Sequence, residues 1–257
     1  MVRFALVVEQ SSRSILPDFY IIGAQKAATT SMYEWLSRQK NCNLPRIKEP
    51  HYFSDDQRFS RGLKWYLSLF DAHGGPLVRG DVDPDYLCSP EAPGRISSLH
   101  RDTVPRFVVL LRNPYDRARS HWQMSSRKSL ESREIHEAIS ESFSNWPNND
   151  PEIDYFGNGY YAVALERYIE KFGKENILPV IYEELVSPEY TGQIFNEICQ
   201  FIGLKEVSEV PSNTQRHNII GKPRSKMLMK MIYSEDNPIR KIVGRLIPGE
   251  ELKARAA

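Results

Sequence analysis

Three stretches that are rich in apolar residues predict strands of a buried sheet. They are FYIIG at 19–23, RFVVLLRNP at 106–114 and NILPVIYEEL at 176–185. The first stretch ends in a glycine and the second stops at an Asn-Pro pair, which are residues that commonly interrupt regular structure. Because apolar and polar residues do not alternate in these stretches, we expect strands that are covered on both faces, as in a parallel sheet.

Two segments next to these strands have the apolar spacing of amphipathic helices. In the segment 29–39, Met32 and Leu36 follow hydroxyl-bearing residues that suit a first helical turn. The segment 160–173 ends at Gly173, a residue type that commonly terminates helices. Its predicted buried face consists of Tyr161, Ala164, Leu165, Tyr168, Ile169 and Phe172.

A third helix is expected at 190–204, where Ile194, Ile198 and Phe201 share one face. Strands that alternate with helices place the chain in the α/β class. We therefore predict a parallel sheet that is flanked by helices on both faces.

The length of the chain, 257 residues, fits one large domain. We expect a single domain over 1–257, with a core at about 18–228 and a C-terminal helical tail at 229–257. The polar stretch 124–158 is expected to be an irregular surface connection, with a lid as the alternative.

Composition narrows the class of protein. Hydrophobic residues make up 40% of the chain and charged residues 26%, as in soluble globular proteins. The formal net charge is +1, so no overall field would attract a nucleic acid or a membrane surface. We expect no nucleic-acid partner, and any anion site must be built locally.

The cysteines and the N-terminus bear on the cellular compartment. Cys42, Cys88 and Cys199 lie far apart without a CxxC pair, which argues against a disulfide framework and against a zinc site. The apolar run in MVRFALVVEQ is too short for a signal peptide or a membrane span. We expect a cytoplasmic protein with no membrane span; a lumenal domain whose anchor has been removed is the alternative. The oligomeric state stays open.

The segment GAQKAATTS at 23–31, called here the phosphate loop, joins the first predicted strand to the first predicted helix. Backbone N–H groups at the start of a helix bind anions. In nucleotidases, the pattern GxxxxGKS/T places a Mg²⁺-binding hydroxyl directly after the lysine. Here Lys26 precedes the small residues and the chain contains no Gly-Lys-Ser/Thr, which disfavours a kinase or an ATPase. The alternative is an ordinary capped helix beside an exposed lysine.

A second candidate anion site follows the second predicted strand, in LLRNPYDRARSHW at 110–122. Arg112 ends the strand, where the ligands of open α/β sheets collect, and Ser120 lies on the helix expected after it. An arginine offers a two-pronged donor to a phosphate, and a serine hydroxyl adds another donor. In the alternative interpretation, Arg117 and Arg119 are surface residues of that helix.

Together, GAQKAATTS and RNPYDRARS resemble the nucleotide-binding motifs of the PAPS-dependent sulfotransferases. In that family a strand–GxxKxGTT/S–helix loop binds the 5′-phosphosulfate of 3′-phosphoadenosine-5′-phosphosulfate (PAPS). An R-D/N-P-x-x-R-x-x-S element binds the 3′-phosphate. The chain departs from these patterns at Ala28, where glycine is usual, and alanine tolerates a positive φ poorly. The resemblance implies a P-loop-like sheet.

Further segments resemble the heparan-sulfate and related glycan sulfotransferases and related bacterial enzymes. KEPHYFSDD at 48–56 is similar to the segment that carries their catalytic glutamate, with a histidine nearby. GDVDPDYL at 80–87 is similar to their acceptor-side stretch E-K-S-P-x-Y, with Val82 where a lysine is frequent. RHNIIGKPRSKML at 216–228 lies where the family has a basic loop over the nucleotide.

The resemblance implies roles in donor binding. Lys26 would stabilise charge that develops on the leaving 5′-phosphate. Arg112 and Ser120 would bind the 3′-phosphate, with Lys222 and Arg224 as further candidates. The phosphate loop would contribute Gln25, Lys26, Ala27, Ala28, Thr29, Thr30 and Ser31. The product would be 3′-phosphoadenosine-5′-phosphate (PAP), and we expect no metal.

On the acceptor side, the resemblance favours Glu49 as the general base, because an attacking hydroxyl must lose its proton. His51 is the competing base. The expected acceptor contacts are Lys48, His51, Asp83 and Tyr86. The resemblance implies sulfonate transfer from PAPS to a hydroxyl of a carbohydrate or glycoconjugate. The alternatives are a hydroxyacyl-carrier, lipid or tyrosine acceptor, or a nucleotide-binding protein or kinase without sulfotransfer.

Overall fold

The structure, a computed structural model, describes residues 16–71, 77–147, 150 and 152–211. The described residues fall into two compact units, of which the second comprises 114–159 and the first comprises the segments before and after it. The predicted C-terminal tail and the candidates Lys222 and Arg224 lie outside the described residues. The single-domain boundaries stay a prediction.

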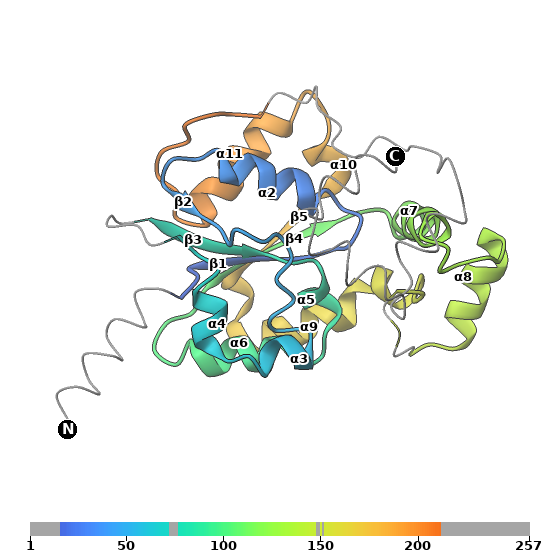
Figure 1. The fold of residues 1–257 in the computed structure, drawn as a ribbon. Coiled ribbons are helices and arrows are strands. Elements are labelled where there is room, and N and C mark those ends of the chain that lie inside the picture. Colours follow the sequence, from blue (N-terminus) through green and yellow to red (C-terminus); the bar gives the residue numbers. More distant parts are fainter. Residues whose placement is uncertain (1–15, 72–76, 148–149, 151, 212–257) are drawn as a thin grey trace, which may run out of the picture. The chain divides into compact units, whose positions relative to one another are not determined.

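A five-stranded parallel sheet forms the centre of the first unit, with the strand order β2-β3-β1-β4-β5 (Figure 1). Strand β1 pairs with β3 on one side and with β4 on the other, so that Phe19 lies beside both Gly80 and Arg106. The strands span Phe19–Gly23 (β1), Cys42–Asn43 (β2), Val78–Val82 (β3), Arg106–Leu111 (β4) and Ile177–Ile181 (β5). The predicted α/β fold is confirmed.

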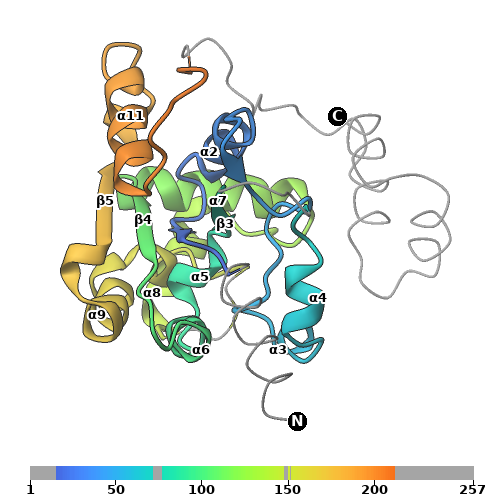
Figure 2. The same ribbon diagram turned by 90° about the vertical axis from the view of Figure 1, so that its left-hand side faces the viewer.

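Helices cover both faces of this sheet. Helices α2 and α11 lie over one face, and α4, α5, α6 and α9 lie over the other (Figures 1 and 2). Among the described residues, no helix is both long and apolar enough to cross a membrane. The helices of the first unit span Thr29–Ser37 (α2), Asp56–Phe59 (α3), Leu63–Leu67 (α4), Asp85–Cys88 (α5), Ala92–Leu99 (α6), Tyr161–Phe172 (α9), Tyr182–Leu185 (α10) and Thr191–Phe201 (α11), with a short 3-10 turn at Lys174–Asn176.

Helix α9 follows its predicted pattern with one exception. Ala164, Tyr168 and Phe172 are buried, as an amphipathic face requires. Ile169 is 43% exposed, so its predicted place on the buried face is wrong. The helix ends before Gly173, whose φ of +81° suits glycine, and the predicted C-cap is confirmed.

Strand β3 was not predicted, because its sequence VRGDV carries two charged residues and a glycine. A Cβ atom on Gly80 would lie 1.9 Å from the Phe19 ring, so glycine is what lets the neighbouring strand pack so closely. Asp81 is fully buried within the same strand. Two buried tyrosine hydroxyls donate to its Oδ2, from Tyr66 at 2.7 Å and from Tyr86 at 2.9 Å.

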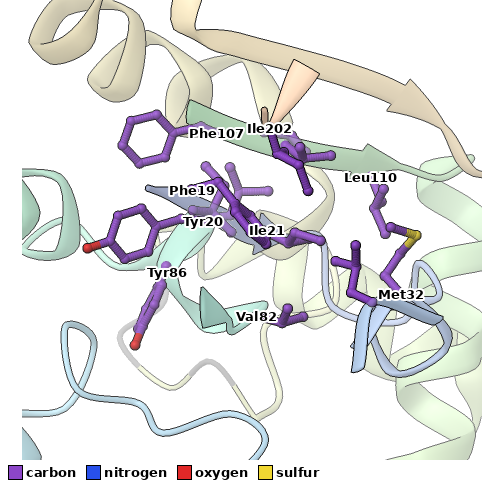
Figure 3. Close-up of a cluster of buried hydrophobic side chains, with 14 of the residues drawn as sticks. Phe19, Tyr20, Ile21, Met32, Val82, Tyr86, Phe107, Leu110 and Ile202 are labelled. Atoms are coloured by element: carbon purple, nitrogen blue, oxygen red, sulfur yellow. The ribbon is translucent and has the colours of Figure 1, made fainter. Parts of the chain in front are cut away.

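Aromatic side chains fill much of the core around β1 (Figure 3). The Tyr20 ring stacks on Phe107 at a centroid distance of 5.6 Å and meets Phe53 edge-on at 5.7 Å. Phe107 in turn contacts Tyr168 of α9 at 5.2 Å. Full burial of such a side chain contributes about 1.5–3 kcal/mol, so these rings fix the helices of this layer to β1 and β4.

The second unit contains two helices, where the sequence had indicated an irregular connection beyond residue 124. Helix α7 spans Pro114–Arg127 and α8 spans Ile135–Ser144, followed by a 3-10 turn at Gly157–Gly159. A small core of Ala118, Ala138 and Tyr155 holds these elements together. The expectation of an irregular segment is therefore wrong for its helical part.

Hydrogen bonds of the charged side chains of Arg117 and Glu131 stabilise the second unit. Its side chain is fully buried, and its Nη2 donates to the Tyr155 carbonyl. Glu131 receives two guanidinium hydrogen bonds from Arg133, at 2.9 and 2.7 Å, and one from the Tyr155 hydroxyl at 3.2 Å. The interpretation of Arg117 as a surface residue is wrong, whereas Arg119 is exposed.

The buried carboxyl group of Asp81 makes the stability of the fold depend on pH. Burial, together with the negative charge of Asp83, raises the pKa of Asp81 to about 7, although the hydroxyls of Tyr66 and Tyr86 act in the opposite direction. The folded protein therefore keeps a proton that the unfolded chain loses near pH 4. This contribution to the free energy of unfolding is present below pH 4 and is lost as the pH rises towards 7.

We expect Asp81→Asn to remove this dependence. The free energy of unfolding of the variant minus that of the wild type should be larger at pH 8 than at pH 5 by roughly 1–3 kcal/mol, because one pKa unit corresponds to about 1.4 kcal/mol. The variant is thus expected to gain stability relative to the wild type as the pH rises. Urea unfolding of both proteins at the two pH values measures the difference. An equal difference between variant and wild type at both pH values would contradict the prediction.

Candidate active site

The ends of three neighbouring strands bring the candidate residues to one edge of the sheet. The phosphate loop follows β1, Asp83 follows β3 and Arg112 follows β4. All three strands run parallel, so their carboxyl ends lie together. Ligands of open α/β sheets bind in the crevice at this edge, and the position predicted for Arg112 at the end of a strand is confirmed.

The phosphate loop has the backbone of an anion cradle. Lys26 and Ala28 adopt left-handed conformations, with φ values of 70° and 66°. Helix α2 begins directly after Ala28, and among the described residues no side chain caps it. The first N–H groups of a helix have no acceptor within the helix, and they attract negative charge. The loop therefore offers donors at the position where a phosphate is expected.

The side chains of the phosphate loop differ in exposure. Thr29 is buried, whereas Thr30, Ser31 and Lys26 are only partly buried. Gln25 does not point at an empty space, because its Nε2 donates to Asp85 Oδ1 at 3.2 Å. A direct role in binding a phosphate remains a prediction for each of these residues.

Arg112 is held by the phosphate loop and by an aromatic ring. Its Nη1 donates to the Lys26 carbonyl at 2.9 Å, and its guanidinium lies 4.6 Å from the centroid of the Tyr182 ring. The Tyr161 hydroxyl donates to the Arg112 carbonyl at 3.0 Å. The Nε atom of Arg112 is buried and has no hydrogen-bond partner among the described residues.

Tyr182 was missed by the sequence analysis. It begins α10 immediately after β5, so the end of a strand was a signal that could have indicated it. Ser120 lies on α7 in the second unit and is partly buried. Its predicted pairing with Arg112 at one phosphate remains a prediction.

The segment 48–51, called here the acceptor loop, carries the candidate base. Glu49 forms an ion pair with its neighbour Lys48. The Glu49 side chain is 33% exposed and the Lys48 side chain is 21% exposed. Glu49 and His51 have φ values of 57° and 52°. A non-glycine residue in this region costs about 1–3 kcal/mol, and such residues concentrate at functional sites.

His51 lies between two carboxylates. Its Nδ1 is 3.2 Å from Asp83 Oδ1 and 3.1 Å from Asp85 Oδ2. Burial alone would lower the pKa of His51, but hydrogen bonds and charges from Asp83 and Asp85 outweigh burial and raise the pKa to about 10. His51 is therefore an imidazolium at neutral pH.

The predicted acceptor contacts of Asp83 and Tyr86 stay predictions. Both side chains are fully buried. Tyr86 donates to Asp81, and its carbonyl accepts from the Tyr168 hydroxyl at 2.8 Å, so it supports the site from inside the core. Asp83 contacts His51 and offers no exposed surface to an acceptor. Lys48 and His51 keep exposed area and stay candidates.

The same carboxylates bear on metal binding. His51, Asp83 and Asp85 each offer a ligand atom, and these atoms lie within 4.8 Å of one another. That spacing would suit a cation, and a metal ion would have to displace the proton from the His51 ring to bind there. The expectation of a metal-free site remains a prediction.

The conformation of Ala28 leads to a prediction. Ala28→Gly removes a left-handed strain of about 1–2 kcal/mol, against about 0.4–1 kcal/mol of added freedom in the unfolded chain. We expect a small rise in the thermal unfolding midpoint. Ala27→Gly is the matched control, because Ala27 is fully buried and the change removes a packed methyl group, which should lower the midpoint. Equal losses in both variants would contradict the strain at Ala28.

Comparison with known proteins relates this geometry to a family. Residues 16–244 match the family described as "Sulfotransferase domain". The human protein "Heparan sulfate glucosamine 3-O-sulfotransferase 3A1" is 28% identical over 250 residues, which cover 95% of this chain and 57% of that protein. The mouse "Heparan sulfate glucosamine 3-O-sulfotransferase 3B1" is 31% identical over 196 residues, covering 75% of this chain and 47% of that protein. The chain thus spans about half the length of these curated relatives.

A solved structure gives an independent likeness. The sulfotransferase from Alicyclobacillus acidocaldarius superposes with a TM-score of 0.67 at 27% identity, covering 78% of this chain and 85% of that one. On its sequence and its fold, the chain belongs to the sulfotransferase family.

Proposed function

We propose that this protein transfers a sulfonate group from PAPS to a hydroxyl group of a carbohydrate. The observation that carries the proposal is the contact between Arg112 and the Lys26 carbonyl, which joins the two candidate phosphate-binding elements into one donor site. Family membership supports PAPS as the donor. The names of the relatives, which refer to the glucosamine of heparan sulfate, support a glycan acceptor.

The residues of the donor site fit an anion with two phosphate groups. The N–H groups at the start of α2 and the Lys26 ammonium would hold the 5′-phosphate, and the Arg112 guanidinium would serve the 3′-phosphate. PAPS supplies the sulfonate that is transferred. Lys26 would balance the charge that remains on the phosphate as the bond to sulfur breaks.

Glu49 is the proposed general base, and the state of His51 supports this choice. A base must be unprotonated before the reaction, but the carboxylates beside His51 keep its ring protonated at neutral pH. Glu49 is partly exposed and forms an ion pair with Lys48. Glu49 would take the proton of the acceptor hydroxyl while the oxygen attacks sulfur.

Calorimetric titration with PAP tests the donor half of the proposal. Wild type should bind PAP, and Lys26→Ala and Arg112→Ala should each weaken binding by about 10–100-fold, because a charge-assisted hydrogen bond contributes about 1.5–3 kcal/mol. Lys40→Ala, at an exposed lysine beyond α2, is the control and should bind normally. A preference for ATP with Mg²⁺, or unchanged binding in both variants, would indicate a kinase or a structural loop instead.

Turnover of PAPS with heparan sulfate oligosaccharides tests the acceptor half. Glu49→Gln should lower kcat by about 10²–10⁴-fold, because the hydroxyl loses its base, while PAP affinity stays within a factor of about two. Transfer of labelled sulfonate to the oligosaccharide is the measurement. A Glu49→Gln variant with undiminished kcat would exclude Glu49 as the base. Transfer to a lipid or tyrosine substrate alone would exclude the carbohydrate.

A further inference from the structure

We propose that Asp83 and Asp85 are positioning residues that hold His51 as a cation beside their two carboxylates and connect the acceptor loop to the phosphate loop. This inference deepens the proposed function and rests on it for the role of Glu49. The arrangement is a continuous row of side chains that runs from Gln25 through Asp85 and His51 to Asp83.

The acceptor loop has a strained conformation that Asp83 holds in place. Glu49 and His51 both have positive φ values, and such strain persists only where the surroundings impose it. Asp83 Oδ2 accepts the backbone N–H of His51 at 2.6 Å, so a carboxylate holds the strained residue directly. On the other side of the loop, the Arg58 Nη1 donates to the Pro50 carbonyl at 3.3 Å.

Asp83 is itself fixed by the sheet. It directly follows β3, and its N–H donates to the Ile21 carbonyl of β1 at 3.0 Å. Its Oδ1 accepts the N–H of Asp85 at 3.1 Å. Burial raises the pKa of Asp83, so the contacts with His51 are what favour its ionised form. The rigid sheet thereby sets the position of the acceptor loop.

Asp85 contacts both the acceptor loop and the phosphate loop. Its Oδ2 lies 3.1 Å from His51 Nδ1, and its Oδ1 accepts from Gln25 Nε2 at 3.2 Å. Gln25 is part of the phosphate loop, one residue before Lys26. A single partly exposed carboxylate thus connects the donor side of the site with the acceptor side.

The charges around His51 favour its protonated form. Asp83 and Asp85 face its ring from the end of β3 and the start of α5. On its own segment, Lys48 and Glu49 form a pair whose charges offset each other. The backbone N–H of Asp55 donates to the His51 carbonyl at 3.0 Å, and the Arg58 guanidinium donates to the neighbouring Pro50 carbonyl at 3.3 Å. With Nδ1 held by carboxylates, the Nε2–H of an imidazolium remains a donor for negative charge on an acceptor or on the sulfonate.

Titration of His51 by NMR on the full chain tests the clamp that Asp83 and Asp85 form on His51, without requiring turnover. His51→Asn identifies its resonance among the six histidines. We expect the wild-type ring to stay protonated through about pH 9, and Asp85→Asn and Asp83→Asn to lower its pKa by about one unit or more, since a nearby charge shifts a pKa by about 1–3 units. Titration of wild-type His51 near pH 6.5 would overturn the proposal.

Asp18→Asn is the matched control. Asp18 also accepts a backbone N–H of β3, from Arg79 at 2.8 Å, but at the opposite end of the strand. It should leave the His51 titration unchanged. If the buried Asp83→Asn variant fails to fold, the partly exposed Asp85→Asn decides, and Asp85→Glu should restore the titration because it restores the carboxylate.

Two further readouts separate positioning from general support. In Asp85→Asn, kcat should fall as the pH rises from about 7 to 9, whereas the wild type stays level, because only the variant loses the His51 proton there. An equal loss at every pH would indicate a merely structural role and overturn the proposal. Loss of the protonated His51 signal on addition of micromolar Zn²⁺ would identify a metal site instead.

Addition of PAP tests the connection between the loops. PAP should shift the His51 resonance in the wild type, and Gln25→Ala should abolish that shift at a PAP concentration at which calorimetry shows the variant to be saturated. A shift that persists in Gln25→Ala would overturn the connection through Asp85. If PAP does not bind at all, the donor half of the proposed function fails, while the pH titration still decides whether the clamp exists.

Discussion

Buried carboxylates at the end of β3 must be satisfied without water, and the first unit is arranged around this requirement. Asp81 and Asp83 are fully buried, and a buried charge without partners is strongly unfavourable. Tyrosine hydroxyls serve Asp81, while His51 and two backbone N–H groups serve Asp83. The partners of Asp83 come from the acceptor loop and from the start of α5, so the geometry of the acceptor side depends on the contacts that satisfy this buried carboxylate.

Strain in the backbone is concentrated in the same place. Of the five non-glycine residues with positive φ in the described chain, four belong to the phosphate loop or the acceptor loop: Lys26, Ala28, Glu49 and His51. The rest of the sheet therefore compensates for unfavourable conformations that orient a cradle of N–H groups and a carboxylate. Such sites commonly lose function when they are stabilised, because relaxed loops no longer point their groups at one place.

The sequence was informative where one physical signal dominated. Strands β1 and β4 were predictable because they are apolar throughout, and Gly173 because a positive φ at a helix end favours glycine. Strand β3 was not, since its charged and small residues are explained only by partners distant in sequence, such as Phe19 and Tyr66. The phosphate loop and Arg112 could be indicated by motif, but the contact between them depends on the parallel pairing of β1 and β4.

The position of Arg112 has a consequence for how fast a nucleotide can be captured. Its guanidinium is already fixed by the Lys26 carbonyl and by the Tyr182 ring before any ligand arrives. An arginine that is held in this way loses little side-chain entropy when it binds an anion. Attraction between the dianionic ends of the ligand and this fixed cation should then speed capture, and the rate of capture should fall as the ionic strength rises.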